Sequence, residues 1–264
     1  MSILAEIAEK TRQRVAEEKK SLPLPQLRAQ AEAMDASTGF PFAQALAAPG
    51  MSFICEVKKA SPSKGLIAPN FPYLDIAKEY QAAGAAAISC LTEPYWFQGS
   101  DQYLKEIAQA VTIPVLRKDF TVDEYMIYGA KVLGASAVLL ICAILDDGQL
   151  KDYLALAHSL GLSALVEAHD ETELNRALSA GAGIIGVNNR DLRTFTVDVS
   201  NSLRLRKLAP PEVLFVSESG IKTPEDIQKL YDNGTNAVLI GETLMRAPNK
   251  KEMLDTLRGG PCYE

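Results

Sequence analysis

The sequence lacks the features that mark several classes of protein. It has no run of about 18 apolar residues, the length that a membrane-spanning helix needs. Charge appears by Glu6, too early for the apolar core of a secretory signal peptide. Acidic residues outnumber basic ones, 33 to 27, and the net charge of -6 argues against a nucleic-acid partner. We therefore expect a cytoplasmic protein with neither a membrane nor a nucleic-acid partner.

Residues that form disulfides and metal sites are also scarce. The two histidines, His158 and His169, cannot build a His-rich metal site alone. No pair of cysteines has Cys-x-x-Cys spacing, and the first three lie in apolar runs where a reduced cysteine acts as a small hydrophobe. The four cysteines are Cys55, Cys90, Cys142 and Cys262. We expect reduced cysteines and no metal.

What the sequence does contain is a repeat of apolar runs and helix-like segments. Near-continuous apolar runs are typical of parallel strands covered on both faces. Strand–helix alternation repeated eight times favours a closed barrel over an open sheet, and 264 residues suit such a barrel. We predict one α/β domain, a (β/α)8 TIM barrel, over residues 1–264. The eight runs are Phe53–Val57, Ala86–Leu91, Ile113–Leu116, Ala137–Ile141, Ala164–Val166, Ile184–Val187, Val213–Val216 and Ala237–Ile240.

Residues 1–48 fall outside this repeat. Apolar residues at helical spacing from Ile3 to Val15 indicate an amphipathic helix, which proline breaks at Pro23 before a second helix restarts at Leu27. The sequence thus predicts an N-terminal helical extension. It either braces the barrel or forms a lid over the C-terminal ends of the strands.

Charged and amide residues follow several of the apolar runs, where such barrels carry their catalytic groups. Strand alternation places Glu56 and Lys58 on one side, an arrangement that a buried salt bridge would also explain. The wider set supplies acids, a base and anion contacts around one mouth, and clustered cations can lower a lysine pKa enough to make a general acid. The set comprises Glu56, Lys58, Lys118, Glu167, Asn188 and Arg190.

The last two runs carry a different signal. Gly220 and Gly241 follow them and precede predicted helices, and in barrels a phosphate site made of backbone N–H groups falls there. His169, two residues after Glu167, either takes part in catalysis or orients its loop and caps the next helix. Phe97 and Phe120 either line an aromatic pocket or cover the barrel rim.

Together these motifs resemble indole-3-glycerol phosphate synthase, and the likeness covers nearly the whole chain. The matching stretches are Glu56–Gly65, Phe97–Ser100, Leu116–Phe120, Val166–Asp170, Asn188–Leu192 and Glu218–Ile221.

The resemblance implies a carboxy-lyase of tryptophan biosynthesis that needs neither cofactor nor metal. Its substrate would be 1-(2-carboxyphenylamino)-1-deoxyribulose 5-phosphate, converted to indole-3-glycerol phosphate with loss of carbon dioxide and water. At the matching positions, Lys118 resembles the general acid of ring closure and Glu167 the base. Lys58 resembles the group that assists dehydration or holds the carboxylate, and which lysine serves which step stays open. Glu56 and Asn188 would position the lysines and the substrate hydroxyls.

The resemblance also implies the binding contacts. Arg190 would grip the anthranilate carboxylate, with Phe97 and Phe120 beside the substrate, and Glu218 and Ser219 would lie at the sugar. The phosphate would be held by Ser61, Gly220, Gly241 and Glu242, the last through its backbone N–H with its side chain turned away from the phosphate. Since the chain ends soon after the eighth unit, we expect a monofunctional enzyme. We also expect a monomer, with an oligomer left open.

Two rival functions stay open from the sequence. Lys118 or Lys58 could act as a Schiff-base nucleophile, as in barrel aldolases, although the accompanying arginine suits acid–base chemistry on a carboxylate. A non-catalytic phosphate-binding barrel is the other rival, but it would not need Glu56, Lys58, Lys118 and Glu167 together.

Overall fold

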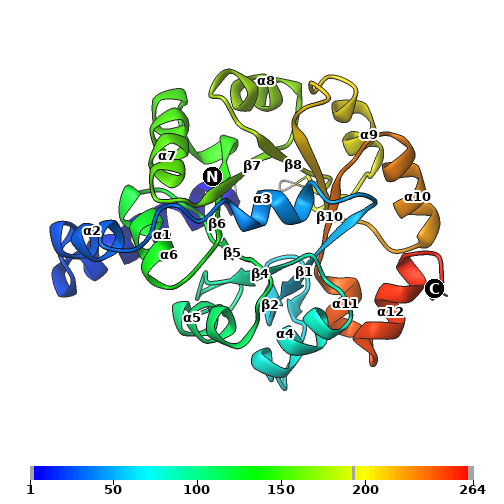
Figure 1. The fold of residues 1–264 in the computed structure, drawn as a ribbon, viewed down its shortest axis with the longest axis horizontal. Helices are drawn as coiled ribbons and strands as arrows, with labels where there is room; N and C mark the ends of the chain where they lie inside the picture. The colour runs from blue at the N-terminus through cyan, green and yellow to red at the C-terminus, as the bar shows by residue number, and fades with distance from the viewer. Residues whose placement is uncertain (1–2, 192–193, 261–264) are drawn as a thin grey trace.

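The computed structural model describes residues 3–191 and 194–260, so Leu192 and Cys262, both named above, lie outside the described residues. The eight predicted strands are all present and close into a parallel barrel, which confirms the (β/α)8 fold (Figure 1). β1 pairs with β4 on one side and with β10 on the other, which closes the ring. The barrel strands are β1 (Ser52–Val57), β4 (Ala87–Leu91), β5 (Val115–Lys118), β6 (Ala137–Ile141), β7 (Ser163–Ala168), β8 (Ile184–Asn188), β9 (Leu214–Glu218) and β10 (Ala237–Ile240).

Alternate residues of each strand enter two separate cores. In β1, Phe53, Cys55 and Val57 pack in the layer between the barrel and its helices, whereas Ile54 packs inside the barrel. Because both faces are covered, every residue of β1 is buried. The described cysteines are buried and pack in the hydrophobic core as small apolar side chains, as predicted.

Helices surround the barrel, and several start at side-chain caps. Thr223 and Asp226 form a reciprocal capping box at the start of α10, where Pro224 occupies the first turn. Ile227 and Leu230 then bury the inner face of that helix. The helices that follow barrel strands are α4 (Tyr73–Ala82), α5 (Asp101–Ala110), α6 (Glu124–Val132), α7 (Asp147–Ser159), α8 (Glu171–Ser179), α9 (Ser200–Arg206), α10 (Pro224–Asp232), α11 (Glu242–Arg246) and α12 (Lys250–Leu257).

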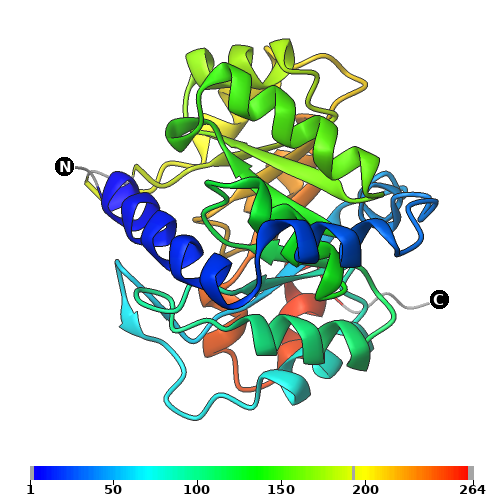
Figure 2. The same ribbon diagram turned by 90° about the vertical axis from the view of Figure 1, so that its left-hand side faces the viewer.

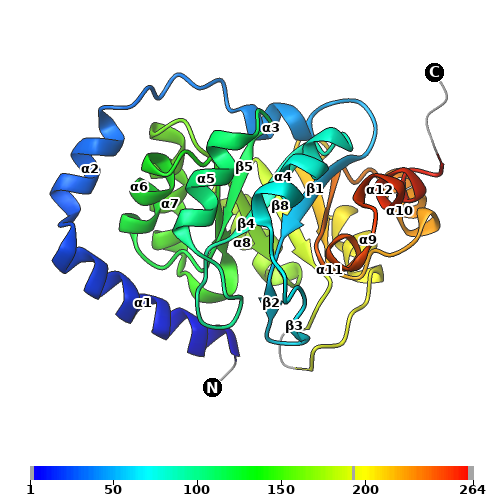
Figure 3. The same cartoon turned by 90° about the horizontal axis from the view of Figure 1, so that it is seen from below.

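The N-terminal extension spans the length of the barrel. The helices α1 (Ile3–Ser21) and α2 (Leu24–Glu32) separate at the predicted proline break, and α1 lies across the outside of the barrel (Figure 2). The short helix α3 (Pro41–Leu46) buries its apolar side chains against the N-terminal ends of the strands. The N-terminal end of α1 lies at the opposite end of the barrel, near the hairpin of β2 (Ala60–Ser61) and β3 (Gly65–Leu66) (Figure 3). Among the described helices, none is long and apolar enough to cross a membrane.

Two ion pairs fasten α1 to the loop that follows β5. Arg14 contacts the buried Asp119 at 2.8 Å, and Lys19 contacts Asp123 at 2.7 Å. Asp119 also accepts a hydrogen bond from Thr92 at 2.6 Å. The extension is therefore attached directly beside the end of the strand that carries Lys118.

Candidate active site

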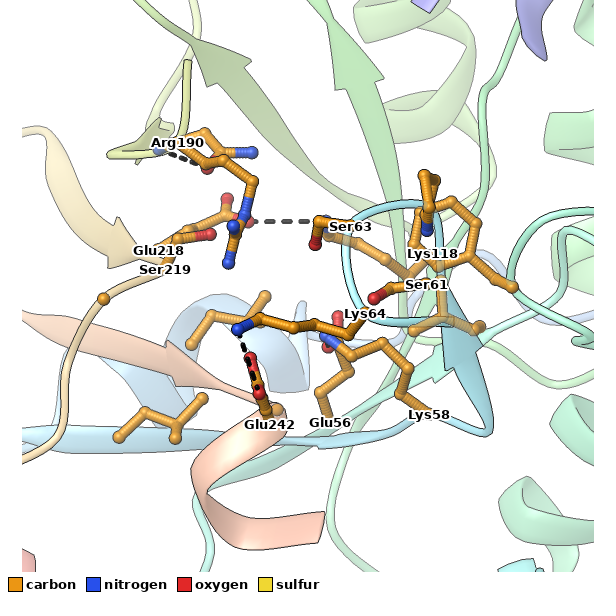
Figure 4. Close-up of a pocket in the computed structure, with 18 of the residues that line it drawn as sticks. Glu56, Lys58, Ser61, Ser63, Lys64, Lys118, Arg190, Glu218, Ser219 and Glu242 are labelled. Carbon is orange, nitrogen blue, oxygen red and sulfur yellow. Dashed lines mark hydrogen bonds and ion pairs between the residues drawn. The ribbon is translucent and has the colours of Figure 1, made fainter. Parts of the chain in front are cut away.

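A cavity of about 630 Å³ opens at the C-terminal ends of the strands, and all eight barrel strands contribute to its wall (Figure 4). Every side chain or glycine that the sequence assigned to the site lines this one cavity. These residues are Glu56, Lys58, Ser61, Phe97, Lys118, Phe120, Glu167, Asn188, Arg190, Glu218, Ser219, Gly220, Gly241 and Glu242.

Two buried clusters, each of which contains both acidic and basic side chains, form the floor of the cavity. The Lys118 ammonium lies 3.5 Å from Glu167 Oε2 and 3.4 Å from Glu218 Oε2. The second cluster is the ion pair between Glu56, on β1, and Lys58, which directly follows that strand. The prediction that neighbouring cations lower the Lys118 pKa is wrong. Burial favours the neutral amine, but the surrounding carboxylates of Glu218, Glu167 and Glu56 outweigh it and raise the Lys118 pKa above its ordinary value.

The two carboxylates that flank Lys118 differ in their readiness to ionise. Burial alone would raise the Glu167 pKa, but Lys118, His169 and Asn188 lower it to about 2. Burial dominates at Glu218 and raises its pKa to about 7, against the attraction of Lys118. Glu218 Oε1 has no hydrogen-bond partner among the described residues. Titratable groups whose pKa values are pushed apart in this way can serve as base and acid in one site.

Asn188 forms hydrogen bonds with both Glu167 and Arg190. Its side-chain amide donates to Glu167 Oε1 at 3.4 Å, and its Oδ1 accepts from the Arg190 backbone N–H at 3.1 Å. The Arg190 guanidinium reaches the rim, where it donates to the Phe195 carbonyl at 3.4 Å. Asn188 thus contacts the predicted base rather than either lysine.

Glycines let the backbone approach these charged groups closely. A Cβ at Gly241 would collide with the Glu56 carboxylate and lie 2.7 Å from Lys58 Nζ. Ser219 and Gly220 both have positive φ, 69° and 86°, so the chain turns sharply after β9. The end of β10 and this turn therefore form one side of the cavity, where the sequence placed the phosphate.

Glu242 keeps its side chain at this side of the cavity. Its Oε1 lies 3.6 Å from Lys64 Nζ (Figure 4). The same oxygen lies 3.1 Å from Arg246 Nε. Both cations line the cavity, and neither was singled out in the sequence. The available signals were weak: Lys64 belongs to the first matching stretch, and Arg246 lies one helical turn after Glu242 on α11.

Gly186 in β8 is a further residue that the sequence patterns did not single out. A Cβ at this position would collide with the Glu218 carboxylate and lie 3.2 Å from Leu165 Cδ1. The absent side chain is what leaves room for Glu218 inside the barrel. A lone glycine within an apolar strand run is the signal that could have revealed this close approach.

Apolar residues close the rest of the cavity. Phe97 and Phe120 both line it, with ring centroids 6.0 Å apart, and Phe120 is also part of the barrel's inner core. Ile3, Leu4 and Ile7 of α1 contribute from the N-terminal extension. Across residues 3–191 and 194–260, no three histidine, cysteine or acidic side chains gather as a metal site.

Comparisons with known proteins agree with this geometry. Solved structures with low sequence identity share the barrel fold alone. One is 3-hexulose-6-phosphate synthase from Salmonella typhimurium, with a TM-score of 0.65, 12% identity, and coverage of 79% of this chain and 97% of that chain. Another is thiamine phosphate pyrophosphorylase from Pyrococcus furiosus, with a TM-score of 0.57, 13% identity, and coverage of 79% and 94%.

Sequence relatives are much closer. Indole-3-glycerol phosphate synthase from Ruminiclostridium cellulolyticum is 56% identical over 97% of this chain and 99% of its own length. The enzyme of the same name from Lachnoclostridium phytofermentans is 51% identical over 97% and 98%. The family described as indole-3-glycerol phosphate synthase matches residues 4–257. The chain belongs to the indole-3-glycerol phosphate synthase family.

Proposed function

We propose that this chain closes the indole ring of indole-3-glycerol phosphate, using Lys118 as the general acid and Glu167 as the base. The substrate is 1-(2-carboxyphenylamino)-1-deoxyribulose 5-phosphate, and carbon dioxide and water leave. The observation that carries these roles is the Lys118 ammonium held between two buried carboxylates of unequal pKa. The family match supports the reaction itself.

Ring closure needs a proton on the ribulosyl carbonyl oxygen while the aromatic carbon attacks the carbonyl carbon. Lys118 supplies this proton, and its charge stabilises the negative charge that develops on the oxygen. A raised pKa keeps the amine protonated in the resting enzyme. A protonated amine has no free lone pair, which disfavours the Schiff-base alternative.

Dehydration needs an acid for the departing hydroxyl and a base for a carbon-bound proton. Glu167, with a pKa of about 2, is ionised at neutral pH and accepts that proton. Lys58, held by Glu56, donates to the hydroxyl as it leaves as water. Asn188 keeps the Glu167 carboxylate in place through its amide.

The remaining lining residues bind the substrate. Arg190 holds the anthranilate carboxylate until it leaves as carbon dioxide, and Phe97 and Phe120 cover the aromatic ring. Glu218, whose Oε1 has no hydrogen-bond partner in the described chain, accepts from a sugar hydroxyl beside Ser219. Backbone and hydroxyl groups bind the phosphate at Ser61, Gly220, Gly241 and Glu242, and Lys64 and Arg246 add positive charge.

Incubation with the carboxyphenylamino-ribulose phosphate tests this function. Indole absorbance should appear together with released carbon dioxide, and steady-state formation of both products should disappear in Glu167→Gln. Failure to detect either product over a range of pH would remove the proposed activity. We also propose that the enzyme works as a cytoplasmic monomer, and gel filtration of the active sample checks its oligomeric state.

A further inference from the structure

His169 lies between two carboxylates at the edge of the cavity. Its Nδ1 forms a hydrogen bond of 2.9 Å with Glu173 Oε2, and its Nε2 lies 3.3 Å from Glu167 Oε1. Nε2 forms no hydrogen bond among the described residues, so its contact with Glu167 is an ion pair without a hydrogen bond. The imidazole therefore connects Glu167, which faces the substrate cavity, with Glu173, which lies outside the cavity lining.

The local chain fixes the imidazole in this place. β7 ends at Ala168, and Asp170 caps α8 by accepting from the Glu173 backbone N–H. The Glu173 side chain turns back and accepts from the His169 backbone N–H at 2.9 Å. From α9, Asn201 donates to the His169 carbonyl at 3.0 Å. Both the backbone and the ring of His169 are thus held by neighbouring elements.

The two acids keep the imidazole charged. Burial favours the neutral ring, but the charges of Glu167 and Glu173 and the hydrogen bond to Glu173 raise the His169 pKa from 6.5 to about 10. Other elements also present titratable groups to Glu167: Lys118 on β5, with Glu218 and Glu56 beyond it, and Cys142 after β6. Of these groups, Lys118 and His169 are the cations that lower the Glu167 pKa.

These two cations differ in whether they keep their proton during the reaction. In the proposed function Lys118 gives up its proton, and its attraction for Glu167 then ends. His169 keeps its proton, because Glu173 holds it from the side away from the cavity.

We propose that His169 is a positioning residue that orients the Glu167 carboxylate and keeps it ionised throughout the cycle, with Glu173 fixing the imidazole. This inference rests on the proposed function, in which Glu167 is the base. Glu167 touches the substrate, while His169 and Glu173 act through Glu167.

The pH dependence of kcat/KM tests the inference in His169→Gln and Glu173→Gln. Loss of a cation within ion-pair distance should raise the Glu167 pKa by about 1–3 units, so the acid limb should move to higher pH in His169→Gln. Glu173→Gln should move it in the same direction by less, and its amide oxygen can still accept from the His169 N–H. Glu171→Gln is the matched control, because it removes an exposed charge from the same helical turn. Acid limbs identical to wild type in both variants would overturn the inference.

NMR titration of the imidazole gives a readout independent of activity. The chain has two histidines, so His169→Gln assigns the signals. We expect His169 to remain protonated at neutral pH in the full-length enzyme and to deprotonate at lower pH in Glu173→Gln. A neutral His169 imidazole at pH 7 would also overturn the inference. Glu167→Gln separates the two proposals. Full turnover in that variant would show that Glu167 is not the base. If Glu167→Gln is inactive but the pH profile of kcat/KM in His169→Gln is the same as in wild type, only the role of His169 is overturned.

Discussion

At the scale of single residues, the charge of each active-site group is set by its immediate neighbours. Lys118 stays protonated because three glutamates surround it, and Glu167 stays ionised because Lys118 and His169 face it. Burial has the larger effect on Glu218, and its pKa rises to about 7. Glu167 and Glu218, which both contact Lys118, therefore differ in their ionisation although they are the same residue type.

Lys118→Ala should lower turnover by about 10²- to 10⁴-fold, the usual contribution of a general acid. Product should still bind, because the phosphate and aromatic contacts remain. Steady-state kinetics and product titration measure the two effects. Lys105→Ala, which removes an exposed lysine on α5, is the control. Unchanged turnover in Lys118→Ala would exclude Lys118 from the chemistry.

Arg190→Lys should weaken substrate binding more than product binding, because only the substrate carries the carboxylate. A guanidinium can hold that group through two parallel hydrogen bonds, which a lysine cannot do. Loss of one charged hydrogen bond corresponds to about a 10- to 100-fold rise in Kd. Calorimetric titration with each ligand measures the difference. Equal weakening of both would show that Arg190 instead binds the phosphate or supports the loop.

Gly186→Ala should displace Glu218, because the new Cβ would occupy the space of its carboxylate. Overpacking of this kind costs about 1–3 kcal/mol of stability, and the displaced carboxylate should also lower kcat/KM. Gly183→Ala is the matched control, since no atom of the described residues beyond its chain neighbours lies within 4 Å of the place that a Cβ would take there. Denaturant melts and kinetics on both variants test the prediction, which fails if the two behave alike.

At the scale of elements, the junction of β7 and α8 couples stability to pH through His169. The folded protein binds the imidazole proton more tightly than the unfolded chain, because the His169 pKa rises from 6.5 to about 10. The resulting stability is fully present below about pH 6.5 and is lost as the pH rises towards about 10. The junction is therefore expected to weaken in alkaline solution.

His169→Gln should remove this contribution, so its Tm should fall less steeply than that of wild type between about pH 6.5 and 10. Thermal melts of both proteins at a series of pH values measure the two slopes. His158→Gln, which changes an exposed histidine on α7, should keep the wild-type slope. Parallel curves for wild type and His169→Gln would contradict the prediction.

At the scale of the whole molecule, the N-terminal extension reaches both ends of the barrel. α3 covers the N-terminal ends of the strands, while Ile3, Leu4 and Ile7 of α1 line the cavity at the other end. The ion pair of Arg14 with Asp119 fastens α1 next to Lys118. This placement suits a lid that screens the reaction from water.

Deletion of residues 1–40 should leave a folded barrel with raised KM and lowered turnover, because α3 and all eight strands remain. Thermal melts and steady-state kinetics on the same truncated sample separate a lid from a brace. A brace would give lower stability with normal kinetics in the folded fraction. Ile3→Ser with Leu4→Ser in the full chain is the finer variant, since it removes cavity contacts and keeps the ion pair. A normal KM in the truncated protein would end the lid hypothesis.

The sequence by itself determined the barrel and the strand ends from which the site is built. Eight apolar runs sufficed, because parallel strands buried on both faces leave a local signal that needs no knowledge of their partners. The strands continue past those runs to Lys118, Asn188 and Glu218, since a polar residue that faces the cavity still pairs through its backbone.

Tertiary structure alone decided which charges meet. The sequence placed Lys118 among cations, but its neighbours are carboxylates brought from β7 and β9. The space that Gly186 leaves for Glu218 and the bridge from Glu167 through His169 to Glu173 likewise depend on side chains facing one another. Electrostatic energy depends on distances of a few ångströms and on burial, and barrel closure sets both between residues far apart in the chain.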